Sequence, residues 1–261
     1  MPINQLVKFC HSEYLLKIGQ CSQCPNKAQG ACISKNCSTC FQEMFFGTDR
    51  TFNCECSTYS YVCRYIYQYS SEILHLLKLV TSFFKDDSGI KIDKLNIMSI
   101  GCGPCSEVFA IESFLKEIDY DNRNVSFTGF DSNNIWSNVH NEIPKVLPFS
   151  TNILYQDCFT HIQSSSNYTY PNILIMNYLL SDICKHGNIT QFIDDVVKHI
   201  IDKMPSRSMV IINDINLWDP RDYYKSLIQK INIRNNAEQI PLSFIGYNYG
   251  YRHSCSHTFF Y

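Results

Sequence analysis

A short apolar segment that ends in a glycine turn constrains the fold of this chain more than any other feature. Residues 95–100 have the composition of a buried parallel strand, and Gly101 and Gly103 then break it. Apolar residues recur with helical spacing over 108–115, so the segment predicts a strand, a tight turn and a helix. Such a turn points free backbone N–H groups and the positive helix end at whatever lies above it. We therefore expect a ligand site above the two glycines.

Further strand-like segments alternate with helical patterns along the rest of the chain. The expected strands cover residues 125–130, 152–155, 171–176 and 209–212, and the expected helices cover residues 105–117, 133–146, 189–203 and 219–231. Strands that alternate with helices specify a parallel sheet that is covered on both faces. Residues 242–247 and 255–261 are expected to close this sheet as an antiparallel hairpin.

Polar residues stand at the expected carboxyl ends of three of these strands. Asp131 follows the second strand, Asp157 follows the third and Asn177 follows the fourth. One such residue is usually a helix cap, but ligands of parallel sheets also bind at this edge, near the switch in strand order. Together with the glycine turn, the row predicts a binding site along one edge of the sheet.

The turn and these strand ends resemble class I S-adenosylmethionine-dependent methyltransferases, whose first strand ends in G-x-G-x-G or a close variant. A dinucleotide fingerprint would place its third glycine at the position of Ser106. Two residues depart from the methyltransferase pattern: Ser99 stands where the family usually has an acid, and Cys105 replaces the third glycine. The resemblance covers residues 92–261. It implies a Rossmann-like, doubly wound α/β fold, with a mostly parallel seven-stranded sheet and an antiparallel C-terminal strand.

The resemblance also implies a site for S-adenosylmethionine. In this family an acid at the place of Asp131 accepts both ribose hydroxyls, a task that suits an ionised carboxylate because it only accepts. An acid at the place of Asp157 commonly meets the adenine amino group. The implied cofactor-binding residues are Gly101, Cys102, Gly103, Asp131, Ser132, Asp157, Cys158 and Asn177.

The methyl acceptor and the catalytic residue remain unknown from the sequence. Asn177 and Tyr178 occupy the place where this family contacts the acceptor. Enzymes of the family that methylate amino groups carry N/D-P-P-Y/F there, and the residues of 177–180 lack it, which disfavours that class of acceptor. No residue is identified as a catalytic base.

The first 63 residues form a different kind of segment, because they hold nine of the fourteen cysteines. The segment has few aliphatic residues, and burying them cannot offset the conformational entropy lost on folding, about 1.5 kcal/mol per residue. Residues 1–20 contain no apolar run of a signal peptide, so we expect reduced thiols that bind a metal. The expected metal ligands are Cys10, Cys21, Cys24, Cys32, Cys37, Cys40, Cys54 and Cys56.

Zinc is the expected metal, with an iron–sulfur cluster as the alternative. Two C-x-x-C pairs, Cys21/Cys24 and Cys37/Cys40, can meet around one tetrahedral ion. The alternative rests on Cys32, which gives the C-x4-C-x2-C spacing of plant-type ferredoxins with the second pair. The spacing does not decide which cysteines share an ion.

A tyrosine-rich segment, residues 58–84, is expected to form one helix between the two regions. Its tyrosines are either stacking platforms over a substrate or part of the buried face, for which Tyr65, Tyr69 and Ile73 have the spacing of four. We favour the buried face.

The predicted organisation is therefore a cysteine-rich metal module (1–63), a connecting helix and linker (64–91) and a methyltransferase-like domain (92–261). The net charge of −2 gives no global field for nucleic acid, and no apolar run approaches the length of a membrane span. We expect a cytoplasmic protein without a membrane partner, of unknown oligomeric state. The leading hypothesis is a methyltransferase whose module recruits RNA or an RNA-associated protein. The alternatives are a non-catalytic interaction protein on a degenerate methyltransferase scaffold and a redox-sensing iron–sulfur protein.

Overall fold

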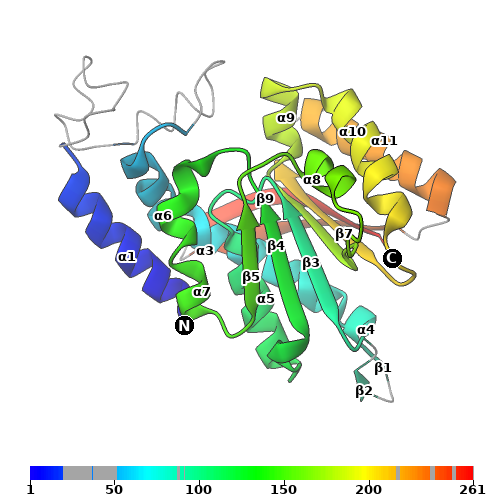
Figure 1. Ribbon diagram of the computed structural model, residues 1–261, viewed down its shortest axis with the longest axis horizontal. Coiled ribbons are helices and arrows are strands. Elements are labelled where there is room, and N and C mark those ends of the chain that lie inside the picture. Colours follow the sequence, from blue (N-terminus) through cyan, green and yellow to red (C-terminus); the bar gives the residue numbers. More distant parts are fainter. Residues whose placement is uncertain are drawn as a thin grey trace.

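Five parallel strands form the centre of the fold (Figure 1). The computed structural model describes residues 1–19, 37, 52–86, 89–90, 92–215, 218–235, 239–248 and 251–260. The parallel strands are β3 (Leu95–Ile100), β4 (Val125–Phe130), β5 (Ser150–Leu154), β6 (Ile173–Asn177) and β7 (Met209–Ile215). They lie in the order β5-β4-β3-β6-β7, and every neighbouring pair is parallel. The predicted α/β fold with a parallel sheet is confirmed.

The strand order reverses at the predicted glycine turn. The chain passes from β3 to β4 and β5 on one side and later returns to β6 and β7 on the other. A crevice opens at such a switch point, beyond the carboxyl ends of the two central strands. The turn after β3 and the residue Asn177 at the end of β6 therefore lie where parallel sheets bind ligands.

Two further strands continue beyond β7. They are β8 (Gln239–Asn248) and β9 (Tyr251–Phe260), which pair antiparallel with each other, and β9 pairs antiparallel with β7. A separate two-stranded hairpin, β1 (Lys85–Asp86) with β2 (Gly89–Ile90), precedes β3.

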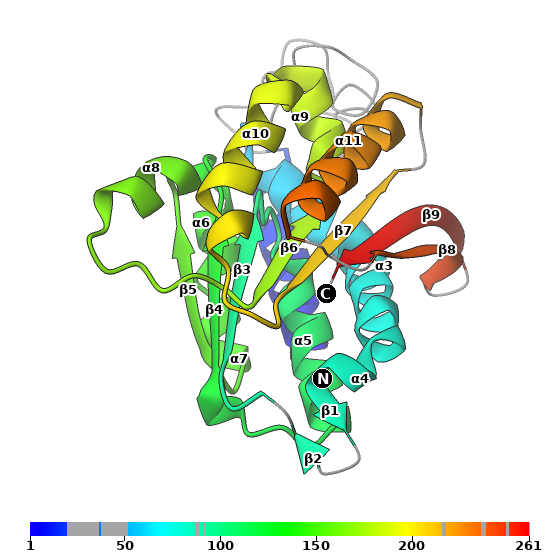
Figure 2. The same ribbon diagram turned by 90° about the vertical axis from the view of Figure 1, so that its right-hand side faces the viewer.

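Helices cover both faces of the sheet, as Figure 2 shows. One face carries α1 (Pro2–Lys17), α3 (Glu55–Leu79), α4 (Thr81–Phe84), α5 (Ser106–Glu117), α6 (Ser137–His140) and α7 (Ile143–Val146). The other carries α8 (Cys158–Ser164), α9 (Leu180–His186), α10 (Ile189–His199) and α11 (Trp218–Asn235). Three short 3₁₀ turns, η2 (Asn122–Asn124), η3 (Asn134–Trp136) and η4 (Ile201–Lys203), join these elements. Side chains of β3 alternate between two cores: Leu95 and Ile97 face the first set of helices, and Met98 and Ile100 face the second.

Three of the predicted helices are divided or differ in extent. The one expected over 189–203 ends at His199 as α10, and η4 follows it. The expected helix over 133–146 is divided into η3, α6 and α7, and Pro144, which lacks an N–H, lies at the start of α7. The expected helix over 58–84 begins earlier, at Glu55, and breaks at Val80 (φ −110°, ψ 29°) before α4. Tyr69 and Ile73 are buried, as we expected of the buried face, whereas Tyr65 is only partly buried.

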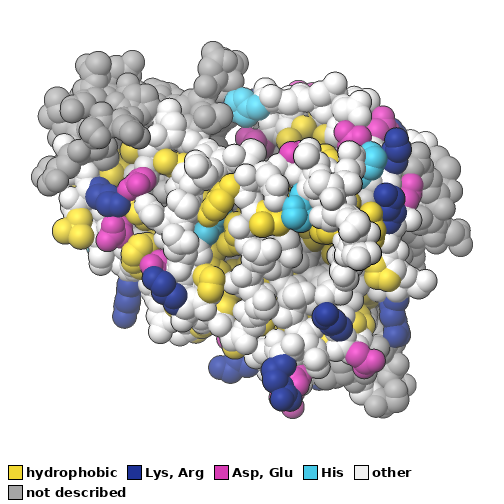
Figure 3. Space-filling model, in the orientation of Figure 1, with side chains coloured by type: hydrophobic (Ala, Val, Ile, Leu, Met, Phe, Trp, Pro, Cys, Tyr) yellow, Lys and Arg dark blue, Asp and Glu magenta, His cyan; other side chains and the backbone are white. Residues whose placement is uncertain are grey.

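The predicted division at residues 63 and 64 falls inside α3. Residues of α1, among them Leu6 and Cys10, pack in the same core as α3, α5 and β3. Within the described segments, no helix combines the length and apolar character that crossing a membrane requires. On the described part of the face in Figure 3, acidic and basic side chains are interspersed rather than gathered by sign.

Candidate functional site

The backbone of the turn after β3 is shaped so that a ligand can come close to it. Gly101 and Gly103 have φ values of 62° and 45°, in the left-handed region that favours glycine. The Cys102 N–H donates to the Phe130 carbonyl of β4 (3.0 Å), which fixes the turn against the neighbouring strand. A Cβ added to Gly101 would lie 2.5 Å from Leu179 Cδ1, whereas one added to Gly103 would meet no atom within 4 Å. The open side of the turn is therefore at Gly103.

Asp131 lies directly at this open position. Its Oδ2 accepts a hydrogen bond from the Gly103 N–H (2.8 Å), and its Oδ1 accepts one from the Asn133 N–H (2.8 Å). Burial raises the pKa of this carboxyl. Ser132, beside it, is exposed. The two predicted parts of the cofactor site, the turn and the acid after β4, are thus in hydrogen-bond contact.

A carboxylate from α5 lies against Ser99 of β3, the position at which the sequence pattern led us to expect an acid. The Ser99 hydroxyl donates to the Glu107 carboxylate, and the Ser106 hydroxyl donates to it as well (3.3 Å). Glu107 is buried, which raises the pKa of its carboxyl to about 7. Sequence reasoning did not identify Glu107. The sequence did contain one signal for Glu107: it is an acidic residue among the apolar positions that form the buried face of the predicted helix.

Asp157 and Cys158 lie where β5 passes into α8. The Asp157 side chain is exposed and caps α8, since its Oδ1 accepts from the Thr160 N–H (2.7 Å) and hydroxyl (2.9 Å). Cys158 is buried in the first turn of the helix. A contact of Asp157 with adenine stays a prediction.

A buried polar network joins the ends of β6 and β7 to helix α3. Asn177 donates through Nδ2 to the Ser106 hydroxyl (3.1 Å) and accepts through Oδ1 from Asn213 Nδ2 (2.8 Å). The Asn213 Nδ2 also donates to Glu72 (2.8 Å), and the Tyr178 hydroxyl donates to the same carboxylate (3.0 Å). Glu72 and Asn213 are fully buried. Tyr178 has a φ of 56°, a strained conformation for a residue with a Cβ.

Tyrosines of α3 continue this network toward solvent. The rings of Tyr69 and Tyr178 lie 4.4 Å apart, and Tyr65 stacks on Tyr69 at 5.7 Å. The hydroxyls of Tyr61 and Tyr69 lie 3.1 Å apart. Sequence reasoning identified the tyrosines but not Glu72, although the spacing of three from Tyr69 puts this acid on the same helix face.

The predicted metal ligands fall into three groups. Cys37, Cys54 and Cys56 are buried in one small cluster with Ile18. Cys10 packs in the main core. The other four, Cys21, Cys24, Cys32 and Cys40, lie outside the described residues. The metal assignment therefore stays a prediction.

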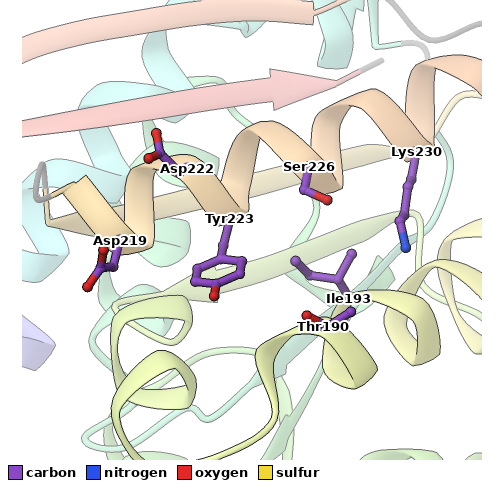
Figure 4. A pocket seen from close by; sticks show the side chains of 7 residues that line it. All are labelled: Thr190, Ile193, Asp219, Asp222, Tyr223, Ser226 and Lys230. Carbon is purple, nitrogen blue, oxygen red and sulfur yellow. The ribbon is translucent and has the colours of Figure 1, made fainter.

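A pocket of about 370 Å³ opens between α10 and α11 (Figure 4). Thr190 and Ile193 line it from α10, and Asp219, Tyr223 and Lys230 line it from α11. No residue of the glycine turn belongs to its lining, so this pocket is distinct from the predicted cofactor site.

Three solved structures share the fold of this chain at low sequence identity. A provisionally assigned O-methyltransferase from Klebsiella pneumoniae is 9% identical, covers 73% of this chain and 79% of its own, and has a TM-score of 0.50. A provisionally assigned class I S-adenosylmethionine-dependent methyltransferase from Listeria monocytogenes is 11% identical, with coverages of 76% and 61% and a TM-score of 0.51. The CurJ carbon methyltransferase is 9% identical, with coverages of 99% and 69% and a TM-score of 0.51.

No protein-family model matches the sequence, and no curated protein matches it either. At 9% to 11% identity the structural likeness shows the fold alone. The chain thus has the Rossmann-like α/β fold that is found in class I methyltransferases, with the five-stranded parallel sheet described above.

Proposed function

We propose that this chain is an S-adenosylmethionine-dependent methyltransferase. The observation that carries the proposal is the hydrogen bond between the Asp131 carboxylate and the Gly103 N–H (2.8 Å), at the switch point of the sheet. It brings a ribose-type acceptor and an open backbone turn to one place. A complete seven-stranded methyltransferase sheet, in which β9 is the antiparallel strand and lies between β7 and the edge strand β8, is part of the same proposal.

The cofactor residues have distinct tasks in this proposal. Asp131 accepts hydrogen bonds from the ribose hydroxyls, which requires its ionised form. Gly103 leaves room for the ligand because it has no Cβ, and the start of α5 presents the positive end of its dipole. Asp157 and Cys158 border the adenine side at the start of α8. When bound, S-adenosylmethionine supplies an activated methyl group with its own leaving group.

The network around Glu72 serves the acceptor side. Asn177 and Tyr178 lie at the end of β6, and both are connected to the buried Glu72 carboxylate, directly or through Asn213. A nitrogen or oxygen acceptor loses a proton when it gains a methyl group, and a carboxylate within reach can take that proton. Glu72 is the proposed proton acceptor, and Tyr178 positions the substrate.

The amino-terminal cysteines are proposed to form a metal module, with zinc as its metal and an iron–sulfur cluster as the alternative. The proposal rests on the spacing of the two C-x-x-C pairs, and three of the expected ligands, Cys37, Cys54 and Cys56, share one buried cluster. We propose that the module recruits the acceptor, RNA or an RNA-associated protein, in the cytoplasm.

A transfer assay with methyl-labelled S-adenosylmethionine tests the function. Purified protein is incubated with RNA and protein fractions of a cell extract, and label sensitive to ribonuclease or to protease identifies the acceptor class. Glu72→Gln is expected to lower incorporation by about 10²- to 10⁴-fold while cofactor binding is retained. The matched control is Glu117→Gln, an exposed acid of α5 that pairs with Lys78. Absence of both cofactor binding and incorporation would favour the non-catalytic alternative instead.

A further inference from the structure

Two thiols and an imidazole meet directly beneath the glycine turn. One ligand atom each from Cys102, Cys105 and His140 lies within 4.8 Å of the other two, and all three side chains are buried. The cysteines come from the turn between β3 and α5, whereas His140 ends α6. Gly129 of β4 leaves the space for this group, because a Cβ there would lie 2.9 Å from Cys102 Sγ. The fold itself therefore brings the three residues together.

The hydrogen bonds of His140 define which ring nitrogen can bind a cation. Nε2 lies 2.6 Å from the Gly103 carbonyl oxygen, which only accepts, so Nε2 carries the proton. With the proton on Nε2, the neutral ring has a lone pair on Nδ1. The Tyr155 hydroxyl lies 2.9 Å from Nδ1, so a cation bound there takes the place of this hydrogen bond, and the released hydroxyl belongs to a side chain that is 38% exposed. A histidine that donates its second N–H to a backbone carbonyl is typical of metal ligands.

Cys105 stands in a conformation that glycine would adopt more easily. Its φ is 53°, in the left-handed region, which is strained for a residue with a Cβ. This is also the position at which the sequence pattern expects the third glycine. A glycine would fit this backbone without strain but would provide no thiol, so the thiol is what this chain gains from a cysteine here.

Both thiols are buried, whereas redox-active dithiols are partly exposed. Zinc binds thiolates, so both cysteines lose their protons when the ion binds. The two thiolates then balance the charge of the Zn²⁺ ion within the site.

We propose that Cys102, Cys105 and His140 bind a Zn²⁺ ion that holds the glycine turn in place. Two thiolates and one imidazole are a known donor set for zinc, with the fourth tetrahedral position open to water. Binding breaks two S–H bonds, forms two S–Zn bonds and one N–Zn bond, and releases two protons to solvent. The ion is separate from the amino-terminal cysteines, and the site is independent of whether the chain transfers methyl groups.

Zinc content measured by elemental analysis tests the proposal on the full-length protein. The double variant Cys102→Ser/Cys105→Ser and the variant His140→Gln are each expected to contain one zinc fewer per chain than the wild type. The glutamine amide nitrogen corresponds to the histidine Nε2 and so keeps a donor for the Gly103 carbonyl. Cys184→Ser, on α9, is the matched control and should keep the full content. Zinc at the amino-terminal cysteines adds equally to every protein, so the difference remains one.

A second measurement covers the case in which the variants do not fold. Hydrogen exchange of chelator-treated wild-type protein is followed with and without added Zn²⁺. Slower exchange over residues 101–107 and around His140 is expected. The proposal is overturned if folded double variant retains the wild-type zinc content, if zinc leaves this exchange unchanged, or if mass spectrometry of the wild type finds Cys102 and Cys105 joined by a disulfide.

Discussion

Replacing each glycine of the turn by alanine should have different effects on stability and on cofactor binding. Both have positive φ values, 62° at Gly101 and 45° at Gly103, so each alanine carries the same backbone cost of about 1–2 kcal/mol. Their surroundings differ. The new Cβ at Gly101 would lie 2.5 Å from Leu179 Cδ1, whereas at Gly103 it would enter open space.

The expected free energies follow from this difference. Gly103→Ala should lower the free energy of unfolding by the backbone cost alone, about 1–2 kcal/mol. Gly101→Ala must also displace the buried Leu179 side chain, and overpacking of this kind costs about 1–3 kcal/mol more. Cofactor binding should be affected in the opposite order. Gly103→Ala should weaken it more than Gly101→Ala does, because the Cβ at Gly103 fills the space that a ligand needs.

Urea denaturation followed by circular dichroism measures the stabilities, and calorimetry with S-adenosylmethionine measures the binding. Gly187→Ala is the control, since its φ is −139° and a Cβ there meets Ile183 at an ordinary 3.4 Å. It should change stability by less than about 0.5 kcal/mol. Equal destabilisation by Gly101→Ala and Gly103→Ala, or a Gly103→Ala variant that binds the cofactor like the wild type, would refute the reasoning about this turn.

Two further predictions concern stability. Burial raises the pKa of Asp214 above its ordinary 3.8, so the carboxyl contributes stability at low pH that is lost as the pH rises through the raised value. The wild type should therefore lose stability relative to Asp214→Asn as the pH rises above 3.8 in denaturation experiments, and a constant difference would contradict this. Tyr120 donates from a buried hydroxyl to the Ile92 carbonyl (2.8 Å), so Tyr120→Phe should cost about 1 kcal/mol. The control Tyr168→Phe removes only a weak contact to the Met98 sulfur (3.7 Å) and should cost less; the opposite order would count against the assignment.

The central strands could be predicted from the sequence because their signals are local. Residues 95–100 and 125–130 are strands with the predicted bounds, since each is a short apolar run that ends in a turn. The same logic placed Gly103 and Asp131 at neighbouring strand ends, and the structure brings them into contact. Parallel strands share one carboxyl edge, so residues that follow them meet without further information.

The rest of the site depends on contacts between distant parts of the chain. Glu72 enters from a helix that precedes the sheet, and only the packing of α3 brings it to Asn213. Glu107 contacts Ser99 across the glycine turn between β3 and α5, which a comparison position by position does not detect. His140 reaches the cysteines of the turn because the predicted helix over 133–146 is divided, so that α6 ends beneath the loop.

Calorimetric titration with S-adenosylmethionine tests the central claim most directly. Wild-type protein is expected to bind with a dissociation constant in the micromolar range, about −8 kcal/mol. Asp131→Ala removes the acceptor of two ribose hydroxyls, each bond to a charged group contributing about 1.5–3 kcal/mol, and should weaken binding by at least about 100-fold. Asp121→Ala, at an exposed loop residue paired with Arg123, should bind like the wild type. Absence of binding to the wild type, or equal affinity of the wild type and Asp131→Ala, would contradict the account.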